Sequence, residues 1–454
     1  MNAPLLGWTG IARLGLVQAA LGAIVVLTTS TMNRVMVVEL ALPAMLPGAL
    51  VGLHYAVQIL RPRLGYGSDV GGRRTPWIVG GIATLGLGAV LAALAIALLD
   101  RYPASGIALA IAAFVLIGVG VGAAGTSLLV LLAKRVDERR RAAAATVVWL
   151  MMIAGFVVTT VVVGQLLDPY SATRLLALTA AVAVIALLLT VVAVHGLERP
   201  GATAQAAHAG AGATAPKPRF REALGQVWDE PQARRFTIFV FVSMLAYSAQ
   251  DLILEPFAGA VFGMTPGQST QLAGLQHGGV MLGMIAVTLA CSVIGGPRLG
   301  SLRTWTVLGC VASALALLAL AASGRAGPGW PLEANVFALG VANGAFAVAA
   351  IGSMMSFAGA GRAAREGVRM GLWGAAQAIA FGLGGFLGAA ASDLARSLLD
   401  APGLAYGLVF ALEALLFLGA AVLAATLGGT HAAARRPAGA APHPAALASQ
   451  ETPA

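Results

Sequence analysis

The chain has 454 residues, of which 59% are hydrophobic and only 10% are charged, and its mean hydropathy is +0.86. Apolar runs of about 20 residues recur along it, which is the length of a helix that crosses a bilayer, so a polytopic membrane protein is predicted and a soluble protein is excluded. The net charge of +10 does not indicate nucleic acid as a partner, because the basic residues lie in loops that flank apolar runs, where membrane topology and anionic lipid explain them.

Twelve transmembrane helices are predicted, six in each half, so the expected fold class is an all-α polytopic membrane protein with 6+6 pseudo-symmetry. The first six cover residues 11–31, 44–60, 76–99, 106–133, 142–166 and 174–196. The other six cover residues 235–250, 271–294, 305–323, 333–358, 370–392 and 404–428. Residues 1–198 and 235–428 are expected to form two six-helix bundles, joined by a cytoplasmic linker (199–234) with a short amphipathic helix and followed by a disordered cytoplasmic tail (429–454).

The basic residues also predict the orientation. Of the 28 Lys and Arg residues, 22 lie in the loops after even-numbered spans, the linker and the C-terminal tail, and only 5, among them Arg34, lie in the opposite loops. Because basic residues of short loops stay on the cytoplasmic side, both termini are expected there. The first ten residues carry no basic residue and the first apolar run is long, so no cleavable signal is predicted.

The two halves show weak internal repetition. Glu39 in VVELA corresponds to Glu255 in ILEPFA, and three further pairs of landmarks are offset by similar amounts, from 216 to 229 residues in all. Both glutamates are predicted at the edge of a membrane span, where an acidic group is a functional candidate more often than an ordinary surface residue is. The alternative is that they are interfacial caps or partners of Arg34.

Five other residues, in or beside the predicted spans, are candidates for binding or coupling. Helical spacing places His54, Gln58 and Arg61 on one stripe, and His277 occupies a corresponding place in the second half. The alternative for each histidine is a hydrogen bond to a neighbouring helix. Glu413, midway along the last span, requires a partner, water or a proton. We find no metal cluster, nucleophile elbow or phosphate loop in the sequence and expect no enzyme.

The loop between the second and third spans resembles a known signature. It reads GYGSDVGGRR from Gly65 to Arg74 and is similar to the G-x-x-x-D-x-x-G-R-R/K motif of the major facilitator superfamily. The resemblance implies a major facilitator fold in which Gly65, Asp69, Arg73 and Arg74 latch the two halves together in one conformational state. Asp69 is expected to accept hydrogen bonds from a helix N-terminus or from Arg73.

A narrower resemblance bears on function. The segments NRVMVVEL (33–40) and QDLILEPFAGAVFGMT (250–265) resemble those of the PucC-like bacteriochlorophyll delivery family, a branch of the same superfamily. This implies a multi-pass protein of a bacterial inner or photosynthetic membrane that binds bacteriochlorophyll or a late precursor, with no covalent cofactor. The partners implied are membrane lipids, pigment-synthesis enzymes and light-harvesting or reaction-centre polypeptides. His54 and His277 would then be axial ligands of the pigment magnesium.

Two other functions stay open from the sequence. A proton-coupled transporter of a small solute would use Glu39, Glu255 and Glu413 as proton carriers, and His54 or Arg61 to meet an anionic substrate. A non-transporting assembly scaffold would use the same fold as an interaction platform and would need no alternating access.

Overall fold

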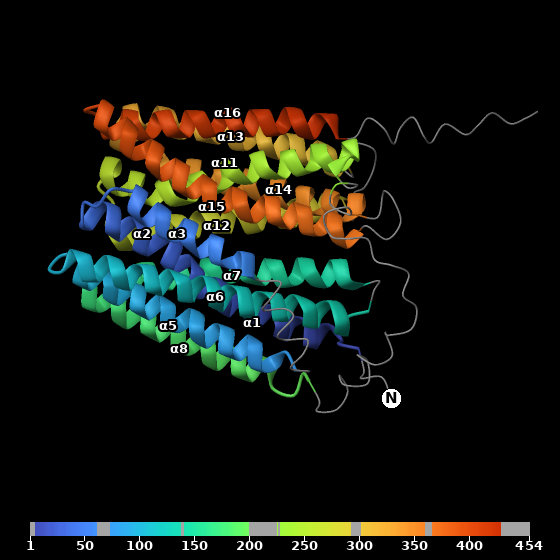
Figure 1. Ribbon diagram of the computed structural model, residues 1–454. Helices are drawn as coiled ribbons and strands as arrows, with labels where there is room; N and C mark the ends of the chain where they lie inside the picture. Colours follow the sequence, from blue (N-terminus) through green and yellow to red (C-terminus); the bar gives the residue numbers. More distant parts are fainter. Residues whose placement is uncertain are drawn as a thin grey trace, which may run out of the picture.

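The computed structural model describes residues 5–60, 73–137, 140–198, 225, 228–291, 301–358 and 366–427. These residues form long helices that lie side by side in one bundle, without a strand among them (Figure 1). The helices of the N-terminal half are α1 (Trp8–Val26), α2 (Met32–Arg34), α3 (Met45–Val57), α5 (Thr75–Leu99), α6 (Pro103–Arg135), α7 (Arg141–Leu167) and α8 (Ala172–Val194). Those of the C-terminal half are α11 (Pro231–Phe262), α12 (Pro266–Leu289), α13 (Leu302–Ala326), α14 (Leu332–Ala358), α15 (Glu366–Leu398) and α16 (Pro402–Thr426).

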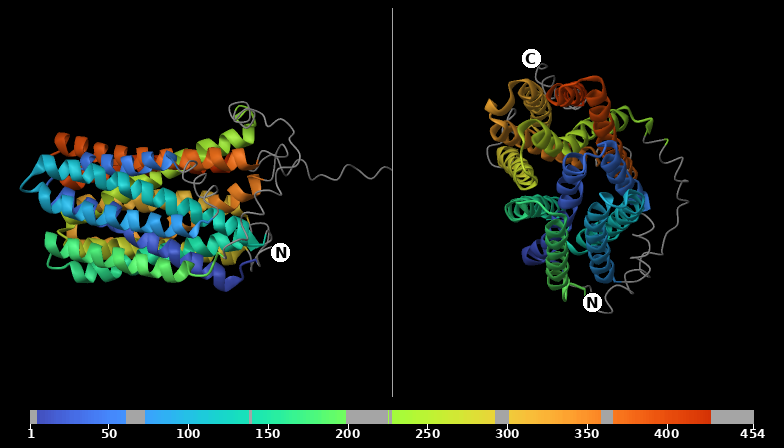
Figure 2. Two further views of the ribbon diagram at one scale, coloured as in Figure 1. Left: turned by 60° about the horizontal axis from the view of Figure 1, so that its bottom comes forward. Right: turned by 90° about the vertical axis from the view of Figure 1, so that its left-hand side faces the viewer.

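Within these ranges, eleven helices are long and apolar enough to cross a membrane, and α3, with its short continuation Gln58–Leu60, is a shorter apolar helix. The prediction of an all-α polytopic membrane fold is therefore confirmed. The same neighbours recur in each half: α5 packs on α6 and α8 as α13 packs on α14 and α16, and α1 packs on α7 as α11 packs on α15. The blue-to-green and yellow-to-red helices form two groups in the views of Figures 1 and 2.

The two halves meet along two equivalent pairs of helices, α7 with α12 and α3 with α15. Small residues allow the close approach. A Cβ added at Gly267 would lie 2.4 Å from the carbonyl oxygen of Gly164, and one added at Gly48 would lie 2.8 Å from the Cβ of Ala389. Such small-residue seams are how membrane helices pack closely without a hydrophobic driving force between them.

Two predicted spans are shorter than the helices that the structure shows. The first helix runs from Trp8 to Glu39 rather than ending at residue 31, and α11 runs to Phe262 rather than ending at residue 250. Arg34, predicted in a loop, therefore lies inside the first helix. Both helices continue because their polar residues face the neighbouring half rather than lipid, where hydrogen-bond partners are available.

Candidate functional site

The first helix is interrupted by two π-helical turns, Leu27–Thr31 and Val35–Glu39, on either side of α2. A π turn widens the helix by one residue and is frequent at functional sites. Here the turns and α2 hold three polar side chains, Ser30, Asn33 and Arg34, which are buried against the C-terminal half.

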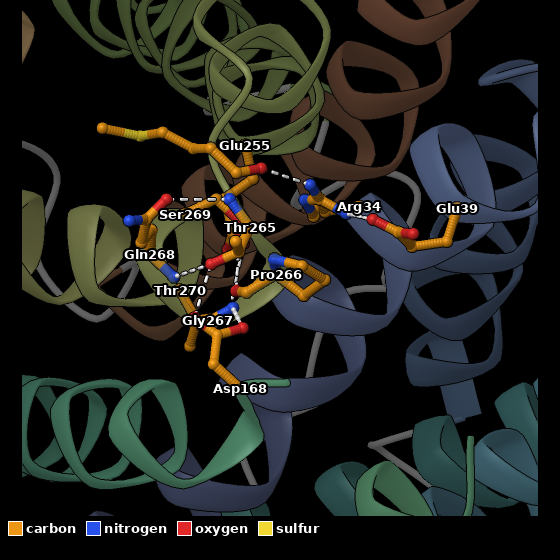
Figure 3. A network of polar contacts seen from close by, with 11 residues as sticks. Arg34, Glu39, Asp168, Glu255, Thr265, Pro266, Gly267, Gln268, Ser269 and Thr270 are labelled. Carbon is orange, nitrogen blue, oxygen red and sulfur yellow. Dashed lines mark hydrogen bonds and ion pairs between the residues drawn. The ribbon is translucent and has the colours of Figure 1, made fainter. Parts of the chain in front are cut away.

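Glu255 of α11 accepts hydrogen bonds at the centre of this interface (Figure 3). Its side chain is 1% exposed, and it lies within α11, seven residues before the end of that helix. Ser30 donates to one carboxylate oxygen, and Ser269 (3.1 Å) and Thr270 (3.5 Å) of α12 donate to the other. These hydroxyls replace part of the solvation that a carboxylate loses inside a membrane domain.

Arg34 connects the two predicted glutamates. Its side chain is 2% exposed and forms an ion pair with Glu39, whose side chain is 33% exposed. It also donates to the carbonyl of Met264 at 2.6 Å, and its positive charge acts on Glu255. Glu39 thus has the alternative role considered from the sequence, a partner of Arg34.

Neighbouring side chains extend this polar network across the halves. Asn33 Nδ2 donates to the carbonyl of Leu252 at 2.6 Å, and the hydroxyls of Thr31 and Thr270 lie 3.2 Å apart. The sequence did not single out Ser30, Asn33 or Arg34 as site residues, although Asn33 and Arg34 lie in the segment that carried the family resemblance. The available signal was the run of polar residues that immediately follows a long apolar stretch.

A second group of ionisable side chains lies on α11 and α16. Glu413 of α16 is 2% exposed, and neither carboxylate oxygen has a hydrogen-bond partner among the described residues. The charge that acts on it is that of Asp251, which is half-buried on α11. Beside Asp251 the ring of Tyr247 packs on Phe381 of α15 (centroids 5.9 Å apart), and Phe381 packs on Tyr55 of α3 (5.4 Å). Asp251 was missed as a candidate although it lies one helical turn before Glu255.

The two histidines lie at different helix interfaces. His54 of α3 is buried, and its Nε2 lies 2.9 Å from Nε2 of Gln58, as the predicted stripe requires. His277 of α12 is half-buried, its Nδ1 lies 2.7 Å from the carbonyl oxygen of Ala273, and Phe156 of α7 packs edge-on against its ring. A neutral His277 that donates from Nδ1 keeps Nε2 unprotonated, which is the state that binds a metal ion.

Most of the predicted superfamily loop, including Gly65 and Asp69, lies outside the described residues, and so does Arg61 of the predicted His54 stripe. The structure describes its end, where Arg73 is exposed and Arg74 is buried at the start of α5. The contacts expected of Asp69 therefore stay a prediction.

Glu198, which follows α8, caps the N-terminus of α5. Its Oε2 accepts hydrogen bonds from the backbone N–H groups of Arg74 and Thr75, both at 2.7 Å, and from the Thr75 hydroxyl at 2.8 Å. A carboxylate at this place satisfies unpaired amides and interacts favourably with the helix dipole. This contact was not predictable from the sequence, because 124 positions separate residue 198 from residue 74.

The predicted site residues thus lie at several separate places in the structure and do not form a single site. Glu39 and Glu255 share the Arg34 network, His54 and Gln58 form a pair, and His277 lies between α7 and α12. Glu413 lies within α16.

Comparison with known proteins identifies the family of this chain. A family model described as PUCC protein matches residues 31–431. A Rhodobacter capsulatus protein named bacteriochlorophyll synthase 44.5 kDa chain is 55% identical over 95% of this chain and 98% of its own length. A Rhodobacter capsulatus protein named Protein PucC is 29% identical over 92% of each chain.

Solved structures of transporters share the fold at low sequence identity. The nucleoside transporter NupG superposes with a TM-score of 0.67 at 14% identity, over 92% of this chain and 100% of its own. A peptide transporter, POT, superposes with a TM-score of 0.64 at 16% identity, over 94% and 97% of the two chains. The helices therefore have the major facilitator arrangement.

Proposed function

Because this chain belongs to the PUCC protein family and has the major facilitator fold, we propose that it binds bacteriochlorophyll, or a late precursor, and delivers it to light-harvesting or reaction-centre complexes during their assembly. The observation that carries the proposal is the 55% identity, over nearly the full length of both chains, to a protein named as a chain of bacteriochlorophyll synthase. We propose a carrier rather than an enzyme, because the fold is that of transporters. It places the protein in a bacterial inner or photosynthetic membrane, in contact with lipids, pigment-synthesis enzymes and the client polypeptides.

His277 is the stronger of the two predicted pigment ligands. Its Nδ1 is oriented by a backbone carbonyl of its own helix, which leaves Nε2 as the nitrogen for an axial bond to the pigment magnesium. His54 would first have to give up its contact with Gln58. Apolar and aromatic neighbours such as Phe156 and Met281 suit a planar ring with an apolar tail.

The test is an absorption spectrum with pigment extraction, made on protein purified in mild detergent from a host that produces the pigment. We expect near-stoichiometric pigment in the wild type, a several-fold loss in His277→Ala and a smaller loss in His54→Ala. His195→Ala, which alters an exposed histidine after α8, is the matched control and should keep the wild-type pigment content. Unchanged pigment in the His54→Ala/His277→Ala double variant would exclude these residues as ligands, and a colourless wild type would contradict the proposal.

The second candidate, a proton-coupled transporter of a small solute, is favoured by one observation. Glu255 and Arg34 lie close together between the two halves, where a proton on the carboxylate would change the balance of charge at the joint. A colourless protein that takes up solute into liposomes under a proton gradient, with uptake lost in Glu255→Gln, would support this candidate instead.

A further inference from the structure

Two aspartates join the halves of the molecule at one end of the bundle. We call this the distal end, because it lies opposite the marked N-terminus (Figure 1). Asp168, just after α7, faces the start of α12, and Asp393, near the end of α15, faces the start of α3. In each case the carboxylate comes from one half and the helix N-terminus from the other.

Each aspartate binds two donors of the opposite half. Asp168 accepts from the Thr265 hydroxyl at 2.5 Å and from the Gly267 N–H at 3.1 Å. Asp393 accepts from the N–H groups of Ala44 (2.9 Å) and Met45 (2.7 Å). These contacts satisfy amides that a helix cannot pair internally, and the negative charge is favourable at the positive end of the helix dipole.

The cap that Asp393 supplies has no substitute within α3. The N-cap residue of α3 is Ala44, which has no side-chain acceptor, so the carboxylate from the other half replaces the usual Ser, Thr, Asp or Asn. At the start of α12, the Thr265 hydroxyl already accepts a hydrogen bond from the Gln268 N–H and so caps the helix. The same hydroxyl donates to Asp168. The start of α3 is thus capped only when the halves are together at the distal end, and the start of α12 gains a further contact there.

The two contacts are related by the internal repeat. Asp168 and Asp393 are 225 residues apart, and their targets Met45 and Gly267 are 222 residues apart, within the range of offsets of the other repeated landmarks. A contact that the repeat has kept in both copies closes the distal end symmetrically. This symmetry distinguishes it from an isolated surface hydrogen bond.

We propose that Asp168 and Asp393 are paired clamps that hold the distal end closed, and that opening of this end requires both carboxylates to leave the helix starts they cap. Each clamp combines charge-assisted hydrogen bonds with a close helix seam, so its loss moves the equilibrium between closed and open forms by roughly five- to tenfold. Loss of both multiplies the two effects. The inference concerns the movement of the halves and does not depend on which ligand the protein carries.

The test is a distance measurement between spin labels in the full-length protein. Labels at Asp100→Cys, after α5, and Gly329→Cys, after α13, report on the two halves at the distal end; both positions are exposed, and a Cβ at Gly329 meets nothing within 4 Å. The two native cysteines are replaced by alanine. We expect a single short distance in the wild type, a longer second population in Asp168→Ala and in Asp393→Ala, and a predominance of the longer distance in the double variant.

Asp400→Ala removes an exposed carboxylate of the same end that makes neither clamp contact, and it should leave the distance unchanged. If the double alanine variant does not fold, Asp168→Asn/Asp393→Asn keeps the size and one acceptor at each site and should give a smaller shift in the same direction. An unchanged distance in a folded double variant, or an equal shift in Asp400→Ala, would overturn the proposal.

Discussion

The glutamates buried within α11 and α16, Glu255 and Glu413, have different surroundings. Glu255 receives hydroxyl donors from two helices and lies near the guanidinium of Arg34. Glu413 has no hydrogen-bond partner in the described part of the chain, and the nearest charge that acts on it, Asp251, has the same sign. Because an unpaired charge is costly inside a membrane, a bound proton or cation would lower the free energy of burying Glu413.

Outside the spans, Tyr170 reports on the electrostatics of the Arg34 network. Burial raises the pKa of Tyr170 to about 12, the charge of Glu39 adds to the rise, and Arg34 lowers it. The neutral phenol is therefore favoured by folding, and this contribution to stability is present below pH 10 and is lost as the pH rises through about 12.

We predict that Glu39→Gln lowers the pKa of Tyr170, because the second cause of the rise disappears. The measurement is the ultraviolet absorbance of the phenolate as a function of pH, taken as the difference between each protein and its Tyr170→Phe counterpart. Glu333→Gln, an exposed carboxylate at the start of α14, is the control and should leave the titration in place. An identical curve for Glu39→Gln would show that Glu39 does not act on the phenol.

At the scale of helices, hydropathy located the elements but not their ends. The apolar runs are sufficient to predict α5, α6, α8 and α16 to within a few residues, because these spans are strongly apolar along their length. The same reasoning ended the first and seventh spans too early, at residues 31 and 250, because it assumes that polar residues leave the membrane. In the structure Asn33 and Arg34 donate hydrogen bonds to carbonyls of the opposite half, and hydropathy contains no information on that partner.

Close helix contacts give a prediction at this scale. A Cβ at Gly283 of α12 would lie 2.1 Å from the carbonyl oxygen of Val341 of α14, whereas one at Gly278 of the same helix meets nothing within 4 Å. Gly283→Ala should therefore force α12 and α14 apart and destabilise the protein by about 1–3 kcal/mol. Gly278→Ala, the matched control, should be neutral or stabilising by up to about 1 kcal/mol. Thermal unfolding in one detergent compares the two, and equal midpoints would contradict the seam between α12 and α14.

At the scale of the whole molecule, the internal repeat could be predicted from the sequence, but the side-chain contacts between distant residues could not. The offsets between landmarks indicated two related halves before the structure, and the recurring helix neighbours agree with them. The candidate site was predicted in part. Glu39, Glu255 and the pair His54–Gln58 were named, whereas Arg34, Asp251, Glu198 and the two clamp aspartates depend on contacts between residues far apart in the sequence.

The orientation of the whole molecule remains a prediction with a direct test. Basic residues such as Arg73, Arg303 and Arg369 lie at or near the starts of α5, α13 and α15, at the end of the bundle where α1 begins, so that end is expected to face the cytoplasm. A green fluorescent protein fused after residue 454 should fluoresce, and alkaline phosphatase fused at the same place should be inactive. The same pair fused after Asp100 should give the opposite result, and agreement between the two fusion sites would contradict the orientation.

The π turns of the first helix also bear on how this family tolerates changes in chain length. Each turn accommodates one residue more than an α-helix of the same rise would, so deletion of one residue within 27–31 would restore regular winding and leave the helix intact. Residues after the deletion would then keep their angular position around the helix, because the π turn had absorbed the residue removed. Asn33 and Arg34 would still face the C-terminal half. A one-residue gap in an aligned relative at this point would thus mark a homologue that has lost the π turn but kept the joint between its halves.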